Sequence, residues 1–593
     1  MDKNNGTPAL SRVNISDIEK WASISFANSN ANPLLAGHRL YKDGYEVTSV
    51  TFPTLTKIAD YAFYGCRSLR SVYFETTVQE IGKYAFTSCI NLRTADFMRS
   101  EGETNPLVLD EGAFWYCRAL PGITRAVNLT KVGAKVFAYC YSMVEFTIPA
   151  SVTEFSRDAF YNDDNLKEVT NLSSAVNGSV FGDKLLAEGT ESKIIRKDHT
   201  IFYNQNGTYY LIGTDAGGQL ADFYTLPNDI NGNPYTVTAY AFIGTAFKNI
   251  TIPSTAQITR ICNYAFAESD IWSLTVYIKL NSDSNHLCYA CEDLREVTLT
   301  GGPVAENAFD SCTSLVNLNL GNVTYIGENA FAGCTSLAEV TLPSTLKRFG
   351  IYGDQFENCT SLTKIVIPEG VTSLPERIFY GCTSLAEVTL PSTLTEFNGT
   401  NIFSGCSSLT KIVIPEGITS LPPRIFSGCT SLAEVTLPST LTEFMGEAAF
   451  SSCTSLTKIV IPEGITSLPS GIFFGCTSLA EVTFPSTLTE FNGKNIFSGC
   501  TSLTKIVIPE GITSLPSGIF FQCKNLAEVV LPSTITSIGF DAFYRAGNAT
   551  TGLHIYFAGT EDAWNAISGL NNAALPKNVT YHFESTGPED TEA

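Results

Sequence analysis

The sequence predicts a β-rich solenoid, in which a right-handed superhelix carries a parallel sheet on its concave face and short turns or 3₁₀ segments on its convex face. Two observations predict it. Nine cysteines, from Cys334 to Cys523, are separated by 23 to 25 residues, and a period of this length is typical of repeat arrays. A short alternation of apolar and polar residues recurs at the same interval, which indicates one β-strand in each repeat.

The repeat spanning Lys505 to Leu526 illustrates the unit. Because side chains alternate along a strand, Ile506 and Ile508 point to one face and Lys505 and Val507 to the other. Pro509 lacks a hydrogen-bond donor and ends the strand. A second apolar set follows, and stacking of neighbouring repeats buries both sets: Ile512, Leu515, Ile519, Phe520, Cys523 and Leu526.

The chain divides by its period into segments. An Asn206-Gly207 pair between two alternating runs predicts a β-hairpin where the period is interrupted. A terminal segment is expected to cap the last repeat, which would otherwise expose its core. We expect an N-terminal lead and partial tryptophan-containing module (1–44), repeats (45–170), a hairpin insert (171–236), repeats (237–552), a capping module (553–582) and a disordered acidic tail (583–593).

The repeat resembles a known family. The pattern L-x-x-V-x-L-P-x-x-x-x-x-I-x-x-x-A-F-x-x-C-x-x-L, clean in residues 326–337, is similar to the BspA-like leucine-rich repeats of bacterial and protist surface proteins. The resemblance covers roughly 45–165 and 237–550. Residues 17–53 and 553–582 look like a short module often found beside such repeats, so the chain is expected to be a trimmed product. The resemblance implies attachment to host matrix or plasma proteins, such as fibronectin or fibrinogen, or coaggregation with other cells.

Composition excludes several classes of function. The net charge of −21 argues against general nucleic-acid binding, which needs basic surface. No apolar run is long enough to span a bilayer, and the polar N-terminus has no secretory segment. The five histidines share no short motif, and no nucleophile elbow or phosphate-binding loop occurs in its required context. We therefore expect no enzyme, no cofactor and no metal site.

The cysteines are best explained as a reduced structural ladder of small buried side chains. Asp163 and Ala546 replace cysteine at two equivalent positions. Neighbouring copies would lie within disulfide range, so a bonded ladder stays an alternative. Cys288-x-x-Cys291 resembles half of a zinc or redox motif, but Cys288 occupies the phenylalanine position of its repeat.

Two surfaces are candidates for ligand binding. The first is the outward sheet face, where lysine and glutamate alternate on adjacent strands and can pair laterally: Lys364, Glu387, Lys411, Glu434, Lys458, Glu481, Lys505 and Glu528. The second is a group of aromatic residues around the N-terminal turns, suited to interfaces or sugar stacking: Trp115, Tyr116, Tyr139 and Tyr141. The alternative for the first surface is that its charges neutralise one another and only keep the protein soluble. The alternative for the second is that the aromatic residues only pack between turns.

We therefore expect a non-enzymatic, adhesin-like protein at the cell surface or outside the cell. It would be a monomer that presents a long repeat surface to an extracellular matrix or plasma protein, or to other cells. A glycan-binding protein of a polysaccharide-capturing system and a structural spacer are the alternatives, because one repeat scaffold serves many partners.

Overall fold

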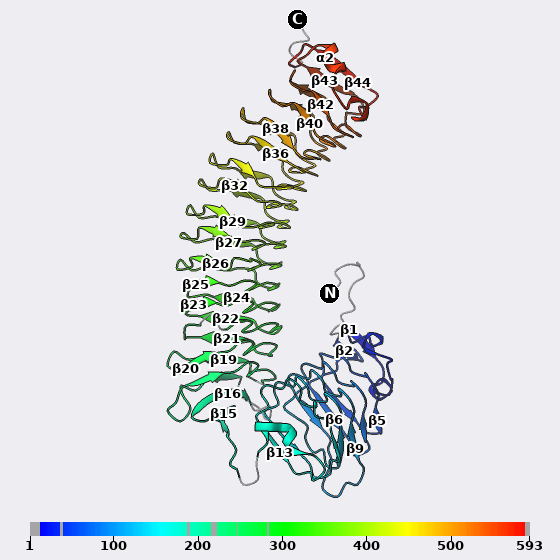
Figure 1. The fold of residues 1–593 in the computed structure, drawn as a ribbon, viewed down its shortest axis with the longest axis vertical. Helices are drawn as coiled ribbons and strands as arrows, with labels where there is room; N and C mark the ends of the chain where they lie inside the picture. The colour runs from blue at the N-terminus through cyan, green and yellow to red at the C-terminus, as the bar shows by residue number, and fades with distance from the viewer. Residues whose placement is uncertain are drawn as a thin grey trace. The chain divides into compact units, whose positions relative to one another are not determined.

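The computed structural model describes residues 12–35, 39–186, 190–214, 222–245, 247–280 and 284–587. The chain forms two compact units, Met1–Ile271 and Trp272–Ala593. Each consists of short parallel strands with little helix, which confirms the predicted solenoid (Figure 1). The predicted domain boundaries stay predictions. Part of the expected lead (1–11) and the end of the expected tail (588–593) lie outside the described residues.

The first unit begins with a small module and two rows of parallel strands. The module comprises β1 (Arg12–Ile15), α1 (Ile18–Ala22), η1 (Ser29–Ala31), β2 (Arg39–Lys42) and β3 (Tyr45–Glu46). The first row comprises β4 (Ser49–Phe52), β6 (Ser71–Phe74), β8 (Thr94–Asp96), β11 (Glu145–Ile148) and β13 (Glu168–Asn171). The second row comprises β5 (Lys57–Ile58), β7 (Glu80–Ile81), β9 (Leu107–Leu109), β10 (Leu129–Val132) and β12 (Glu154–Phe155).

The expected insert contains an antiparallel hairpin that joins the repeat ladder. β15 (Thr200–Gln205) and β16 (Thr208–Thr214) are connected by Asn206-Gly207, and both turn residues have positive φ, as a tight hairpin turn requires. β16 then pairs in parallel with β18 (Tyr235–Val237). The remaining elements of this unit are η2 (Gly178–Lys184), β14 (Ile194–Lys197), β17 (Phe223–Thr225), β19 (Asn249–Ile252) and β20 (Ile258–Ile261).

The second unit repeats the same two rows over a longer stretch. The first row comprises β21 (Ser273–Val276), β22 (Glu296–Leu299), β24 (Asn317–Asn319), β27 (Lys364–Val366), β29 (Glu387–Thr389), β31 (Lys411–Val413), β33 (Glu434–Thr436), β35 (Lys458–Val460), β37 (Glu481–Thr483), β39 (Lys505–Val507), β41 (Glu528–Leu531), β43 (Leu553–Phe557) and β44 (Val579–Phe583). The second row comprises β23 (Gly301–Val304), β25 (Asn322–Ile326), β26 (Arg348–Phe349), β28 (Ser373–Leu374), β30 (Glu396–Phe397), β32 (Ser420–Leu421), β34 (Glu443–Phe444), β36 (Ser467–Pro469), β38 (Glu490–Asn492), β40 (Ser514–Leu515) and β42 (Ser537–Ile538).

The core of the second unit is a column of stacked phenylalanines. From Phe309 to Phe520 the rings of successive repeats lie nearly parallel, with centroids 5.4–6.0 Å apart. The ladder cysteines are buried beside this column and form no disulfide, which supports the reduced-ladder interpretation. Ile506 and Ile508 are buried while Lys505 and Val507 are exposed, so the strands have the predicted register.

Two short helices lie near the ends of the chain and share one arrangement. In α1 the side chain of Asp17 caps the helix, and Trp21 follows four residues later. In α2 (Glu561–Asn565) Thr560 is the cap and Trp564 again lies four residues later. A short η3 (Leu570–Asn572) follows α2.

Candidate functional site

The sheet face of the second unit brings the predicted lysines and glutamates together as cross-strand pairs. Each lysine lies opposite the glutamate of the next strand, in the pairs Lys364–Glu387, Lys411–Glu434, Lys458–Glu481 and Lys505–Glu528. Nζ-to-carboxylate distances are 2.7, 2.6 and 3.1 Å in the first, third and fourth pairs. The positive and negative charges of this row are therefore balanced locally.

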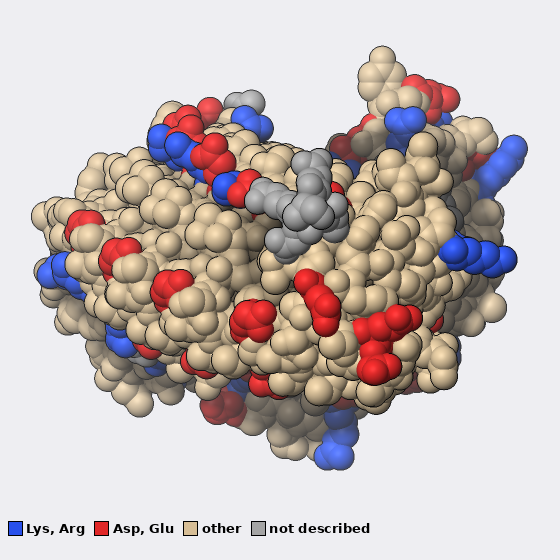
Figure 2. Space-filling view, turned by 90° about the horizontal axis from the view of Figure 1, so that it is seen from above, with Lys and Arg blue, Asp and Glu red and all other residues tan. Residues whose placement is uncertain are grey.

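The electrostatic effect of these pairs is small. The hydrogen bond with Lys364 holds the pKa of Glu387 below its ordinary value, and Glu387 raises the pKa of Lys364. Both side chains are exposed, and exposed ion pairs add little to stability. Figure 2 shows charged side chains in separate patches on a mostly uncharged surface. The paired row creates no strong field to attract a highly charged partner.

A row of exposed valines lies on the same sheet face. Val366, Val413, Val460 and Val507 are 47–59% exposed. Each occupies the outward position one residue from the buried isoleucine of its strand. Near the start of the row is a hollow of about 610 Å³, which includes Val340, Lys364, Val366 and Glu387 in its lining. Exposed threonines occupy the equivalent position on the intervening strands, so the row is apolar on every second strand.

The predicted aromatic residues of the first unit lie together but cover one another. Tyr116 stacks on Tyr139 with ring centroids 4.3 Å apart, and Tyr139 contacts Tyr141 edge-on. Arg118 lies over the rings of Tyr116 and Tyr141 and forms an ion pair with Glu268. All four predicted aromatics are half-buried. Much of their ring surface thus packs within the fold.

Trp115 retains one feature suited to a ligand. Its indole Nε1–H is buried and has no hydrogen-bond partner within the described part of the chain. A hollow of about 570 Å³ lies beside it, and Tyr64, Tyr116 and Arg118 are among the other lining residues. Because the donor itself is buried, this wall offers a ligand only aromatic stacking surface.

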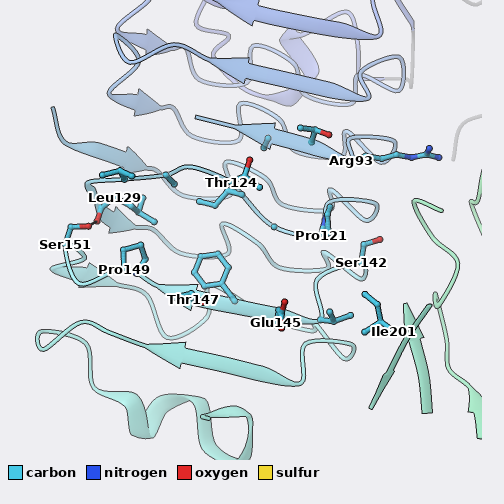
Figure 3. A pocket seen from close by; sticks show the side chains of 18 of the residues that line it. Arg93, Pro121, Thr124, Leu129, Ser142, Glu145, Thr147, Pro149, Ser151 and Ile201 are labelled. Atoms are coloured by element: carbon cyan, nitrogen blue, oxygen red, sulfur yellow. Dashed lines mark hydrogen bonds between the residues drawn. The ribbon is translucent and has the colours of Figure 1, made fainter. Parts of the chain in front are cut away.

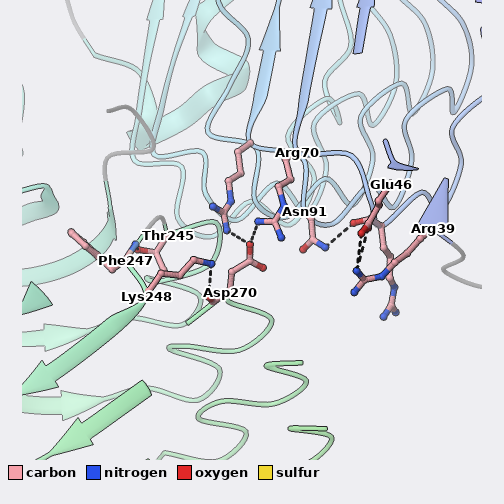
Figure 4. Close-up of polar contacts among 10 residues, drawn as sticks. Arg39, Glu46, Arg70, Asn91, Thr245, Phe247, Lys248 and Asp270 are labelled. Atoms are coloured by element: carbon pink, nitrogen blue, oxygen red, sulfur yellow. Dashed lines mark hydrogen bonds and ion pairs between the residues drawn. The ribbon is translucent and has the colours of Figure 1, made fainter. Parts of the chain in front are cut away.

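A buried ionic cluster in the first unit was not predicted from the sequence. The Asp270 carboxylate accepts hydrogen bonds from Arg70 and Arg93, and Lys248 Nζ donates to the Asp270 carbonyl oxygen over 2.9 Å (Figure 4). Burial by itself would raise the pKa of Asp270, but the adjacent Arg93 and Arg70 hold it below its ordinary value. The cluster joins Asp270 to arginines 177 and 200 positions away in the sequence, and one carboxylate holds both guanidinium groups, which indicates a structural role.

A cleft in the sheet of the first unit was also not predicted. It has a volume of about 860 Å³ and lies between residues 121–129 and residues 142–151 (Figure 3). Ile201 and Arg196 of the hairpin segment also line it, and Arg196 pairs with Glu145 at 2.6 Å. The sequence signal is Pro121-Gly122 and Arg125, where other repeats have strand residues.

Comparison with known families identifies the repeats. The profile of the BspA-type leucine-rich repeat region matches six copies, over residues 37–167, 235–353, 350–448 and 443–553. The chain belongs to the BspA-type leucine-rich repeat family. The predicted resemblance is thereby confirmed. No curated protein matches the sequence.

Solved structures that match this chain include bacterial leucine-rich repeat proteins of low identity. A Bacteroides ovatus leucine-rich repeat protein is 22% identical, with 86% of this chain and 91% of that chain covered and a TM-score of 0.40. A Faecalibacterium prausnitzii leucine-rich cell surface protein is 23% identical, with 64% and 98% covered and a TM-score of 0.33. The pneumococcal vaccine antigen PcpA is 18% identical, with 67% and 100% covered and a TM-score of 0.35.

Metal binding and membrane crossing also bear on the site. Within the described ranges, histidine, cysteine and acidic side chains form no group of three or more placed to hold a metal ion. Helices in the same ranges are all too short or too polar to cross a membrane.

Proposed function

We propose that this BspA-type chain is a non-enzymatic, adhesin-like binding protein that acts at the cell surface or outside the cell. Its partner is an extracellular protein of the matrix or plasma type, or a protein on another cell. The sheet face of the second unit is the proposed contact surface. The observation that carries this proposal is the row of four exposed valines beside self-paired charges.

The physical argument concerns desolvation. Burying an exposed valine is favourable because it removes apolar surface from water. The neighbouring lysine and glutamate already satisfy each other, so a partner is not required to supply a matching charge. Strands of one sheet are about 4.8 Å apart, which places successive valines about 10 Å apart along the row. An extended, mainly uncharged protein surface would contact several of them at once.

The test measures binding of the full chain to surfaces coated with fibronectin or fibrinogen at physiological salt. Binding to a glycan array is measured in parallel under the same conditions. Replacing Val413→Ser and Val460→Ser together is expected to weaken protein binding at least tenfold. Phe474→Ser is the matched control, because Phe474 is 46% exposed but lies in a turn outside the sheet. Replacing Lys411, Glu434 and Lys458 together tests whether the charged row also contributes. Equal binding by the valine variant and the unaltered chain would contradict the proposal.

A second candidate function is glycan binding at Trp115. The adjacent hollow, which Tyr64, Trp115 and Tyr116 line, supports it. Trp115→Ala removes the aromatic ring, and is expected to abolish glycan binding while leaving protein binding unchanged. Binding to glycans alone would favour this function over adhesion to proteins. Binding to neither class would favour a structural spacer.

A further inference from the structure

The first row of strands in the first unit is interrupted at one repeat. β8 is followed by a single bridge between Asp96 and Thr124, and the next strand of the row, β11, pairs only with β13 within the described residues. The sequence explains the interruption. Pro121 lacks an amide hydrogen, and Arg125, with φ of +49°, replaces the apolar residue that ends the strand in other repeats.

One wall of the resulting cleft is an unpaired strand edge. β11 pairs in parallel with β13, and Glu168 N donates to Val144 O. Successive residues of a strand direct their backbone groups to alternate sides, so Glu145 and Thr147 face away from β13. Their backbone N–H and C=O groups have no hydrogen-bond partner among the described residues. Their side chains are exposed.

The opposite wall is the segment around Ile123, which forms one isolated bridge and no strand. Thr124 N donates to Ala95 O and Phe97 N donates to Thr124 O, both at 3.0 Å, so Thr124 faces β8. The neighbouring residue Ile123 therefore directs its backbone groups toward the cleft. They too have no partner within the part of the chain that the structure describes. The cleft thus has unpaired backbone groups at the spacing of a β-strand along β11, and those of Ile123 on the opposite side.

The remaining lining of the cleft favours apolar side chains. Val144 packs with Ile194, Ile201 and Ile212 of the hairpin segment, and Val144 and Ile201 line the cleft. The Arg196–Glu145 ion pair at its rim is already satisfied. Figure 3 shows Ile201 reaching the cleft from a different element than Thr147 and Pro149.

We propose that this cleft binds an extended polypeptide segment of a partner protein, which adds the missing strand between Ile123 and β11. A backbone in extended conformation presents an N–H and a C=O to the same side at every second residue, about 6.6 Å apart, which matches the unpaired groups of Glu145 and Thr147. Strand addition of this kind takes affinity from backbone hydrogen bonds and specificity from alternate side chains. The preferred segment has an apolar residue at every second position. This site lies in the first unit and does not rest on the valine row of the second.

The test uses the full chain and fluorescent nonapeptides in which valine or isoleucine alternates with serine or lysine. We expect saturable binding, measured by fluorescence anisotropy. The same peptides N-methylated at alternate residues keep their side chains but lose backbone donors, and should bind at least tenfold more weakly. Thr147→Pro removes the Thr147 N–H, which the fold itself does not use, and should also weaken peptide binding at least tenfold. The variant should fold, because proline is tolerated at strand edges. Thr147→Val keeps the N–H and should bind normally.

Amide exchange provides a readout that does not depend on a variant folding. The Glu145 and Thr147 amides should exchange quickly in the free chain and become protected when peptide is bound. Failure of every alternating peptide to bind at about 1 mM would overturn the proposal. So would equal binding of the N-methylated peptides, unchanged exchange of both amides, or displacement of a bound peptide by an oligosaccharide.

Discussion

The thiol of Cys429 donates a hydrogen bond to the main-chain carbonyl oxygen of Phe403, one repeat earlier, across 3.1 Å. The same oxygen accepts the backbone N–H of Cys406. Equivalent thiol bonds recur at Cys453, Cys476 and Cys500. The ladder cysteine is therefore both a small apolar side chain and a donor that links consecutive repeats, which explains why one residue type recurs at this position.

The first prediction is that the ladder thiols are chemically inert in the folded chain. Burial raises the pKa of Cys429 to about 12, and the thiolate is the reactive form. A thiol reagent at pH 8, followed by mass spectrometry, should label the partly exposed Cys262 first and the ladder only on unfolding. Cys262→Ser should remove the early labelling. Rapid labelling of a ladder cysteine in the native chain would contradict this account.

The period made much of the fold predictable from the sequence. Each strand of the second unit has the same neighbours as its copies, so the register of Lys505 and Ile506 follows from a local pattern. The long-range ion pairs of the first unit do not follow from the period. Asp270 pairs with Arg93 across 177 positions, and no regular spacing relates two such residues.

The candidate sites were less predictable, because only their regularly spaced residues follow from the repeat period. The Lys364–Glu387 pair lies where alternation placed it. The stacking of Tyr116 on Tyr139 depends on ring orientation in the turns, which sequence spacing does not fix. The cleft beside β11 forms because one repeat has an isolated bridge at Thr124 in place of a strand. Pro121 and Arg125 were its only signal, and each also occurs in ordinary turns.

The second prediction concerns Asp163, which occupies a ladder position. Its side chain accepts a hydrogen bond from Cys140 N at 2.6 Å, but its second oxygen has no partner in the described residues. Burial raises its pKa well above the ordinary value. Between those two pKa values the native state binds more protons than the unfolded state, so stability falls as pH rises. Asp163→Cys should remove this slope and raise the free energy of unfolding at pH 7 by about 1–3 kcal/mol.

Urea unfolding at pH 7 and pH 3.5 measures this effect. The advantage of the Asp163→Cys variant should be largest at neutral pH and shrink in acid, where the aspartate of the original chain is protonated. An advantage of equal size at both pH values would show that the gain comes from packing and not from removal of a buried charge.

The third prediction has the opposite sign and concerns Asp270. Its pKa is held below the ordinary value, so its contribution to stability is present above the ordinary pKa and is lost as pH falls through the lowered value. Asp270→Asn leaves Arg93 and Arg70 without their carboxylate and should cost about 3 kcal/mol at neutral pH. Glu46→Gln is the control, because its ion pair with Arg39 is more exposed and should change stability by less than about 1 kcal/mol. Similar losses in both variants would contradict this assignment.

The last prediction separates backbone strain from steric contact at two glycines of the second unit. Gly353 and Gly511 have φ of +85° and +92°, so alanine at either position is strained, at a cost of about 1–2 kcal/mol. A Cβ at Gly353 would lie 1.7 Å from the carbonyl oxygen of Glu376, whereas a Cβ at Gly511 would meet nothing within 4 Å. Asp354 N donates to that same Glu376 oxygen at 3.1 Å, so the neighbouring repeat cannot move away without losing the bond. Gly353→Ala should therefore destabilise the chain more than Gly511→Ala, by about a further 1–3 kcal/mol. Equal losses in urea unfolding would mean that φ alone requires glycine at Gly353.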